Sequence, residues 1–264
     1  MKIFHFSRKQ VTIERLLTLG TVLLLLLLWF TVTELKLFSD IVVPSPPKVI
    51  SSFWEIAKNG YKGNSLLTHL GDSMIRLIGS FLLVIVTAIP LGLISGYNSK
   101  IRAIIDPLIE FYRPLPPLAY YTLLVLWMGI ENSSKIALLY LAGFAPVYIA
   151  CVAGVQKIKQ DYIDGAYTLG ASSQQIFFHV IFPACLPDMF VGLRTAIGVA
   201  YTTLVAAEMV AAVTGIGWMV LDASKFLRSD IIFVGIFIMG VTGLILDGVL
   251  RIIENKVIPW KGKE

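Results

Sequence analysis

Long stretches that carry almost no charge constrain this chain more than any other feature of its sequence. The clearest runs from Leu16 to Thr33 and holds the letters LLLLLLW between Arg15 and Glu34. A bilayer core of about 30 Å needs roughly 20 mostly apolar residues in each helix that crosses it. Because 56% of the 264 residues are hydrophobic and only 15% are charged, a water-soluble domain could not bury this much apolar surface. The sequence therefore predicts an all-α membrane protein.

Six apolar segments can be distinguished, which predicts about six transmembrane helices in a single domain over residues 1–264. They cover residues 16–33, 77–97, 107–130, 136–156, 188–213 and 231–250. The first follows several basic residues, as the core of a signal peptide would. No small-residue cleavage site follows it, however, and the run is longer than a usual signal core. We expect it to remain as a helix.

The lysines and arginines predict how the chain sits in the lipid bilayer, because they concentrate in cytoplasmic loops. An even number of helices places both termini on one side. The opposite side would hold seven basic residues, and the side with the termini would hold twelve. These twelve are Lys2, Arg8, Lys9, Arg15, Lys100, Arg102, Lys157, Lys159, Arg251, Lys256, Lys261 and Lys263. We therefore expect both termini in the cytoplasm. The same bias and anionic lipid headgroups account for the net charge of +5, so no nucleic acid partner is expected.

The longest polar stretch on the expected cytoplasmic side lies between the fourth and fifth segments. It includes the letters DYIDGAYTLGASSQQIFFHVIFPACLP, in which Asp164, Gly165 and Ala166 are followed by Gly170 and, further on, Pro183. Two short helices joined near Gly170 fit this pattern, since glycine allows a bend that other residues resist. The small residues would let a partner approach the backbone closely. An ordinary helical hairpin fits the periodicity equally well.

This stretch resembles the signature loop of binding-protein-dependent ABC importer permeases, whose pattern is EAA, three residues, G, nine residues, I, one residue, LP. The spacing is kept, with conservative replacements at Asp164, Gly165, Val180 and Phe182. The segments EFYRPLPPLAYYTLLVLWMGI, LGASSQQ and LVAAEMVAAVTGIGWMV are similar to the nitrate, sulfonate and taurine group of these permeases. The first of them, together with the terminal PWKG, is most similar to the taurine permeases.

The resemblance implies a type I ABC importer permease fold over nearly the whole chain, in a bacterial cytoplasmic (inner) membrane. Two permease copies would pair, two ATP-binding subunits would dock on the signature loops, and an extracytoplasmic substrate-binding protein would deliver the solute. Residues 157–183 would form the ATPase-coupling loop. Its contact residues would be those at or next to the motif positions, namely Asp164, Gly165, Ala166, Leu169, Gly170, Ala171 and Pro183.

The solute implied by the resemblance is small and anionic or zwitterionic: taurine or a related aliphatic sulfonate, with nitrate as the alternative. The chain lacks the GxxxxGK[ST] phosphate loop. We therefore expect no catalytic residue and no cofactor in this chain, with ATP and Mg²⁺ bound by the partner ATPase.

Glu208 is the most informative ionisable residue within the apolar segments. A charge at the bilayer centre costs on the order of 3 kcal/mol, so it usually marks a pathway or a pair. Alanines on both sides of Glu208 suit close helix packing. Two hypotheses remain open: Glu208 lies at the gate or translocation path, or it forms a buried pair with Arg76 or Arg194.

The third segment carries Pro114, Pro116 and Pro117, which disfavour a regular helix. Irregular backbone at membrane depth is tolerated mainly where it is buried in protein or lines a cavity. Leu115 and, beyond it, Tyr120 and Tyr121 are therefore candidates for the lining of the path. Glu110 and Arg113 are three residues apart and could simply pair with each other. The three histidines have no metal-ligand partners nearby in the sequence, so we expect no metal site.

Two other classes of protein fit less well. A stand-alone secondary transporter often shows inverted repeats with discontinuous helices in matching positions, and none is visible. A membrane enzyme would be expected to carry a motif such as HExxH or GxSxG, and neither occurs.

Overall fold

The structure is a computed structural model that describes residues 8–260, with the backbone alone for residues 8–15. Over this range the chain forms eleven α-helices and one π-helical turn. Five helical stretches are long and apolar enough to cross a membrane, which confirms the all-α membrane class. These are α1 (Arg8–Glu34), α3 (Leu66–Tyr97), α6 (Asn132–Gln156), the continuous stretch Ser173–Ala211 that ends in α9 (Phe182–Ala211), and α11 (Ser229–Val257).

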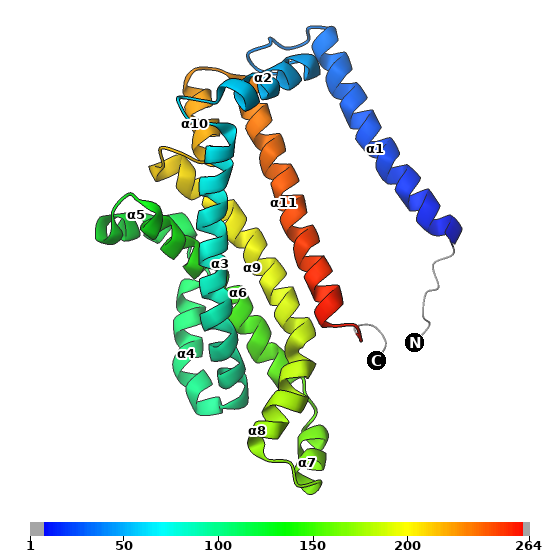
Figure 1. Ribbon diagram of the computed structural model, residues 1–264, viewed down its shortest axis with the longest axis vertical. Helices are drawn as coiled ribbons and strands as arrows, with labels where there is room; N and C mark the ends of the chain where they lie inside the picture. The colour runs from blue at the N-terminus through cyan, green and yellow to red at the C-terminus, as the bar shows by residue number, and fades with distance from the viewer. Residues whose placement is uncertain (1–7, 261–264) are drawn as a thin grey trace.

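The centre of the bundle is formed by α3, α6 and α9 (Figure 1). Within a bilayer the hydrophobic effect does not drive helices together, so they associate through close packing of small residues. A Cβ added at Gly92 of α3 would lie 2.6 Å from the Cβ of Cys151, and one at Gly192 of α9 would lie 2.6 Å from the Cβ of Ala150. Both glycines therefore let a neighbouring helix approach α6 closely.

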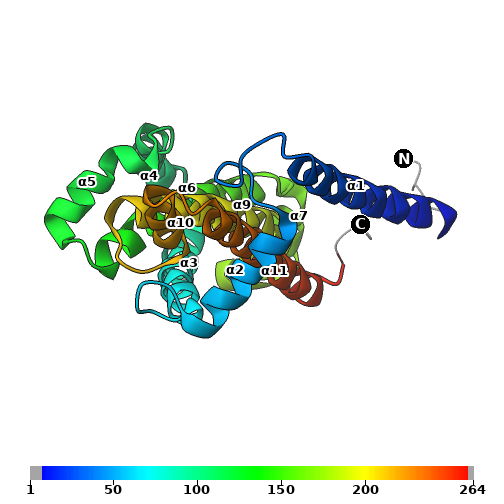
Figure 2. The same cartoon turned by 90° about the horizontal axis from the view of Figure 1, so that it is seen from above.

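The third apolar segment, which we expected to be one spanning helix over residues 107–130, is instead two shorter helices. One is α4 (Ser99–Tyr112), which lies beside the lower half of α3, and the other is α5 (Pro117–Met128), which turns out to the side of the bundle (Figures 1 and 2). The prolines between them lack the N–H that would continue the helical ladder, and Pro116, which precedes Pro117, has left the helical conformation with ψ 128°. At 12 residues, α5 is about 18 Å long and cannot cross a bilayer by itself.

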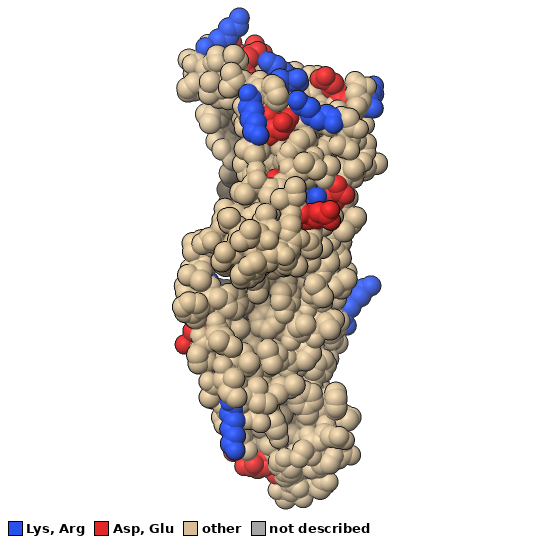
Figure 3. Space-filling model, turned by 90° about the vertical axis from the view of Figure 1, so that its left-hand side faces the viewer, with Lys and Arg blue, Asp and Glu red and all other residues tan. Residues whose placement is uncertain are grey.

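The two ends of the bundle carry different short helices. At one end lie α2 (Pro46–Asn59) and α10 (Ile216–Lys225), and at the other α7 (Gln160–Thr168) and α8 (Ser173–Ile176) (Figure 1). Charged side chains gather at and just below the α2–α10 end, and only scattered ones appear over the rest of this face (Figure 3). This distribution fits a protein whose middle is surrounded by lipid.

Helix α1 stands apart from the bundle, on the side away from α5 (Figure 2). Its leucines are exposed, so their apolar surface must be covered by lipid or by another chain. Its upper end is fixed to the rest of the protein. There the Trp29 indole N–H donates to the Pro44 carbonyl (3.0 Å), and the ring stacks on Phe233 of α11.

Candidate functional site

The turn between α7 and α8, residues 169–172, is closed by two capping motifs that follow one another directly. At the end of α7 the Ala171 N–H donates to the Ala166 carbonyl (3.1 Å) and the Gly170 N–H to the Tyr167 carbonyl (2.9 Å). This is the Schellman arrangement, which requires a left-handed residue, and Gly170 has φ +83°. The next residue, Ser172, opens α8 with a reciprocal capping box to Gln175. The bend that the sequence predicts near Gly170 is confirmed.

The α7–α8 turn presents small and apolar groups to the outside. Leu169 is 88% exposed, and no heavy atom lies within 4 Å of a Cβ built on Gly165. Ala166 and Ala171, in contrast, pack against the buried core of the bundle. The Asp164 carboxylate accepts a hydrogen bond from the Gln160 amide (3.0 Å). A shallow hollow of about 350 Å³ lies beside the turn and is lined by Leu169, Gly170, Ala171, Gln175, Ile176, His179 and Val180.

Pro183 lies apart from the α7–α8 turn. It stands in the first turn of α9, directly after a π-helical turn over Phe177–Ile181. Proline has no N–H to continue the regular ladder, and the chain widens here so that the Phe182 N–H donates to the Phe177 carbonyl. The structure thus joins the α7–α8 turn to α9 without a break in the helix, and Pro183 shapes that joint.

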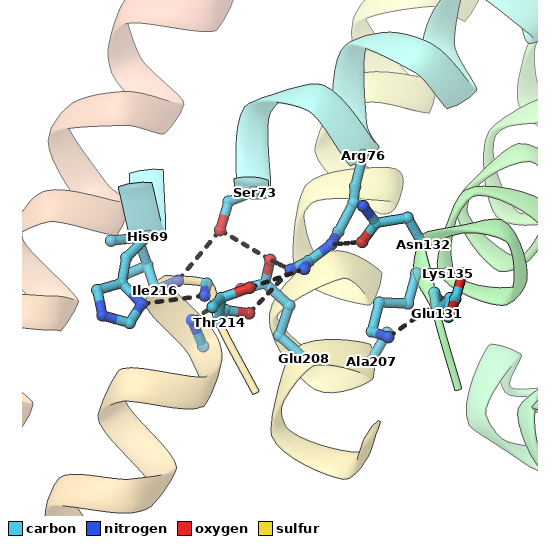
Figure 4. Close-up of polar contacts among 12 residues, drawn as sticks. His69, Ser73, Arg76, Glu131, Asn132, Lys135, Ala207, Glu208, Thr214 and Ile216 are labelled. Carbon is cyan, nitrogen blue, oxygen red and sulfur yellow. Dashed lines mark hydrogen bonds and ion pairs between the residues drawn. The ribbon is translucent and has the colours of Figure 1, made fainter. Parts of the chain in front are cut away.

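Glu208 lies in a buried polar cluster between α3, α9 and the loop that follows α9 (Figure 4). The Arg76 guanidinium (Nη1) and the Ser73 hydroxyl each donate to Glu208 Oε1 at 2.7 Å, and the Gly217 N–H donates to Oε2 at 2.9 Å. Arg76 also donates through Nε to the Asn132 side chain (2.7 Å) and through Nη1 to a loop carbonyl, that of Thr214 (3.0 Å). All the polar atoms of the pair thus have partners within the protein, since Arg76 Nη2 donates to the Thr214 hydroxyl as well.

The loop after α9 folds back over the Glu208 carboxylate and can do so only with glycine at two positions. Gly215 has φ +120°, and a Cβ there would collide with the carboxylate itself. A Cβ at Gly217 would lie 2.7 Å from the Val205 carbonyl oxygen. Glycine is therefore required at 215 by the close approach of the backbone to the Glu208 carboxylate, and at 217 by its close approach to the Val205 backbone of α9.

His69 belongs to the same cluster and was missed from the sequence, where no site was assigned to it. The Gly215 N–H donates to His69 Nδ1 (3.2 Å), so Nε2 carries the proton and donates to the Tyr61 carbonyl (3.2 Å). His69, Ser73 and Arg76 lie at positions i, i+4 and i+7 of α3 and share one face of that helix. This spacing of polar residues on an apolar helix is the signal that could have revealed the cluster.

Of the two partners considered for Glu208, the structure brings it to Arg76. Arg194 pairs instead with Asp247 of α11, at 2.9 Å. Because every nitrogen of the guanidinium and both oxygens of the carboxylate are bonded inside the protein, the pair can fasten elements together and presents no unpartnered atom to a solute. The Arg76–Glu208 cluster thus acts as a structural pin, which means that it holds the loop after α9 against α3.

A cavity of about 320 Å³ lies where α4 gives way to α5, a size within the range of about 300–1,000 Å³ found for small-ligand pockets. Leu115 and Tyr120 line it, as does Arg113, across from residues of α6 such as Pro146. Tyr121 does not reach this cavity. It is buried in the core, and its hydroxyl lies 3.5 Å from the Ala207 carbonyl.

A smaller cavity of about 160 Å³ continues along α6 and shares Arg113 and Ile149 with the first. Glu110, Asp106 and Tyr148 also contribute to its wall. Over the described residues, no group of three or more histidine, cysteine or carboxylate side chains is placed to hold a metal ion. The candidate sites are therefore the α7–α8 turn, the loop after α9 that folds over Glu208, and this pair of cavities.

Comparison with known proteins identifies the family. Residues 88–259 match the model described as "Binding-protein-dependent transport system inner membrane component". The chain belongs to this family of binding-protein-dependent permeases. Among curated permeases, it is 41% identical over 256 residues to the taurine transport system permease protein TauC of Escherichia coli (strain K12), covering 97% of this chain and 92% of that one.

Two further relatives span most of the permease. The putative aliphatic sulfonates transport permease protein SsuC of Bacillus subtilis (strain 168) is 32% identical over 234 residues, covering 89% of this chain and 83% of the relative. The nitrate import permease protein NrtB of Synechocystis sp. is 31% identical over 227 residues, covering 84% and 82%. The resemblance to the nitrate, sulfonate and taurine group is thus confirmed.

Proposed function

We propose that this permease imports taurine or a related aliphatic sulfonate. The observation that carries the proposal is its 41% identity to a taurine permease along nearly the full length of both chains. The sulfonate and nitrate permeases are 32% and 31% identical. The likeness to NrtB makes nitrate the second candidate.

The partners in this proposal are a second copy of the permease, two ATP-binding subunits and an extracytoplasmic substrate-binding protein. The α7–α8 end faces the cytoplasm, where residues 157–183 couple the permease to the ATPase, and both chain termini lie on that side. In support, the exposed Leu169 and the open space at Gly165 offer an apolar contact surface to another protein. Part of the charge bias behind the orientation, including Lys2, Lys261 and Lys263, lies outside the described residues.

The proposed path for the solute runs along the two cavities between α4, α5 and α6. Leu115 and Tyr120 line the larger cavity, which lies where prolines interrupt the third apolar segment. Such interruptions at membrane depth are typical of regions that line a cavity. Glu208 acts on this path, in our proposal, by fixing the loop after α9 rather than by binding the solute.

The test is to purify the permease with its co-expressed ATPase and binding protein and to measure uptake into liposomes. We expect ATP-dependent uptake of taurine or another sulfonate, and no ATP hydrolysis by the permease alone. Uptake of nitrate without any sulfonate would support the second candidate. Robust hydrolysis by the isolated permease, or uptake that needs no ATPase, would contradict the proposal.

A further inference from the structure

Two oppositely charged side chains at the end of α4 are left without partners. Both residues are exposed. Among the described residues, neither the Glu110 carboxylate nor the Arg113 guanidinium takes part in a hydrogen bond or an ion pair. The sequence had suggested that they pair with each other. Arg113 still has helical backbone angles and its N–H donates to the Ile109 carbonyl (3.0 Å), so the two side chains share one face of α4.

These two charges lie deep inside the expected membrane region. Helix α4 starts at the lower end of α3 and has 14 residues, so Arg113 is about 20 Å above that turn. A bilayer core is about 30 Å thick. Charged side chains at such depth usually pair with each other or line a water-filled path. Because Glu110 and Arg113 do not pair, they are available to a solute in such a path.

Both side chains face the smaller of the two cavities described above. Together they line the smaller cavity, and Arg113 stands at its junction with the larger one. A second carboxylate in the smaller cavity, that of Asp106, already accepts a hydrogen bond from the Tyr148 hydroxyl (2.7 Å) and lies 4.0 Å from Arg102. The wall therefore offers one unpartnered cation and one unpartnered carboxylate.

We propose that Glu110 and Arg113 form a subsite that recognises a zwitterion, with Arg113 binding its sulfonate and Glu110 binding its ammonium group. The inference rests on the proposed function. A guanidinium suits an oxyanion because its planar donors can bind two oxygens at once. On a helix, side chains at i and i+3 have Cβ atoms about 5–6 Å apart. That spacing fits a small solute whose two charges are joined by a two-carbon chain, as in taurine.

The same pair of residues discriminates against simple anions. Nitrate would leave the Glu110 carboxylate without a partner and would be repelled by it, so specificity comes from a repulsive element as well as an attractive one. Glu110 is therefore a specificity-determining residue, while Arg113 serves any oxyanion.

The test compares binding of taurine with binding of ethanesulfonate, which has the sulfonate but no ammonium group. Both are measured on the purified permease–ATPase complex without binding protein, by saturation-transfer NMR. Glu110→Gln should weaken taurine binding about tenfold, through loss of one charge-assisted contact, and leave ethanesulfonate binding unchanged or tighter. Arg113→Gln should weaken both. Lys100→Gln, on the same helix but outside both cavities, is the control and should change neither.

Several outcomes would overturn the subsite. These are wild-type taurine binding in both variants, an equal loss of both ligands in Glu110→Gln, or no taurine signal from the wild-type complex at millimolar concentration. Glu110→Asp retains the charge and should keep most of the taurine binding, which separates loss of charge from a folding defect. Liposome uptake by the wild-type complex decides the proposed function separately. If the wild type takes up taurine but the Glu110 and Arg113 variants bind it normally, the subsite alone is refuted. Nitrate uptake without sulfonate uptake would refute both the subsite and the proposed function.

Discussion

Removing one member of the Arg76–Glu208 pair would leave the other charge buried alone. Their side chains are only 4% and 1% exposed. Breaking a buried pair in this way costs about 3–5 kcal/mol, much more than the pair contributes relative to an apolar replacement. We therefore expect Glu208→Gln and Arg76→Met each to lower the unfolding temperature of the purified complex, measured in detergent, and the double variant to lose less than the sum of the two.

The control for this prediction is Lys48→Gln, because the Lys48–Asp40 pair is 44% and 67% exposed. Exposed pairs contribute about 0–1 kcal/mol, so this variant should unfold like the wild type. If Glu208→Gln also unfolds like the wild type but transports differently, Glu208 is a gate and not a structural pin.

The α7–α8 turn depends on the left-handed conformation of Gly170. A leucine there would be strained, since a side chain in this conformation costs on the order of 1–2 kcal/mol. We expect Gly170→Leu to distort the turn, so that the ATPase is lost or its hydrolysis no longer drives uptake, while the membrane helices still fold. The measurements are the amount of ATPase retained on purification and uptake into liposomes.

Gly170→Asn is the matched comparison, because asparagine is the other residue that commonly adopts the left-handed conformation at a helix end. It should retain more ATPase and more uptake than Gly170→Leu. Normal coupling in the leucine variant would show that this turn is not the contact with the ATPase.

The sequence predicted those elements whose signals are local. The apolar runs located the five long spanning helices, and the signature loop placed the bend at Gly170. The prolines at 114, 116 and 117 marked an interruption, but apolar content alone suggested one helix where α4 and α5 are two. The cluster around Glu208 could not be assembled from local patterns, because it joins Ser73 to a residue 135 positions away.

For the molecule as a whole, the approach of α9 to α6 at Gly192 is the contact that can be tested most directly. Gly192→Ala should lower the unfolding temperature, since its Cβ would lie 2.6 Å from that of Ala150. Gly198 lies on the same helix with nothing within 4 Å of a Cβ, so Gly198→Ala should be neutral or stabilise by up to about 1 kcal/mol. Equal effects of the two substitutions on thermal unfolding would contradict this close packing.

The same contact has a mechanical consequence. The helical stretch Ser173–Ala211 has 39 residues, a rod about 58 Å long, and Gly192 is its midpoint. One end bears the α7–α8 turn, and the other bears Glu208 with its pinned loop. A stiff rod that rocks about its middle is a lever with equal arms. A push on the α7–α8 turn would then move the far end by a similar distance in the opposite direction, so that one side of the membrane closes as the other opens.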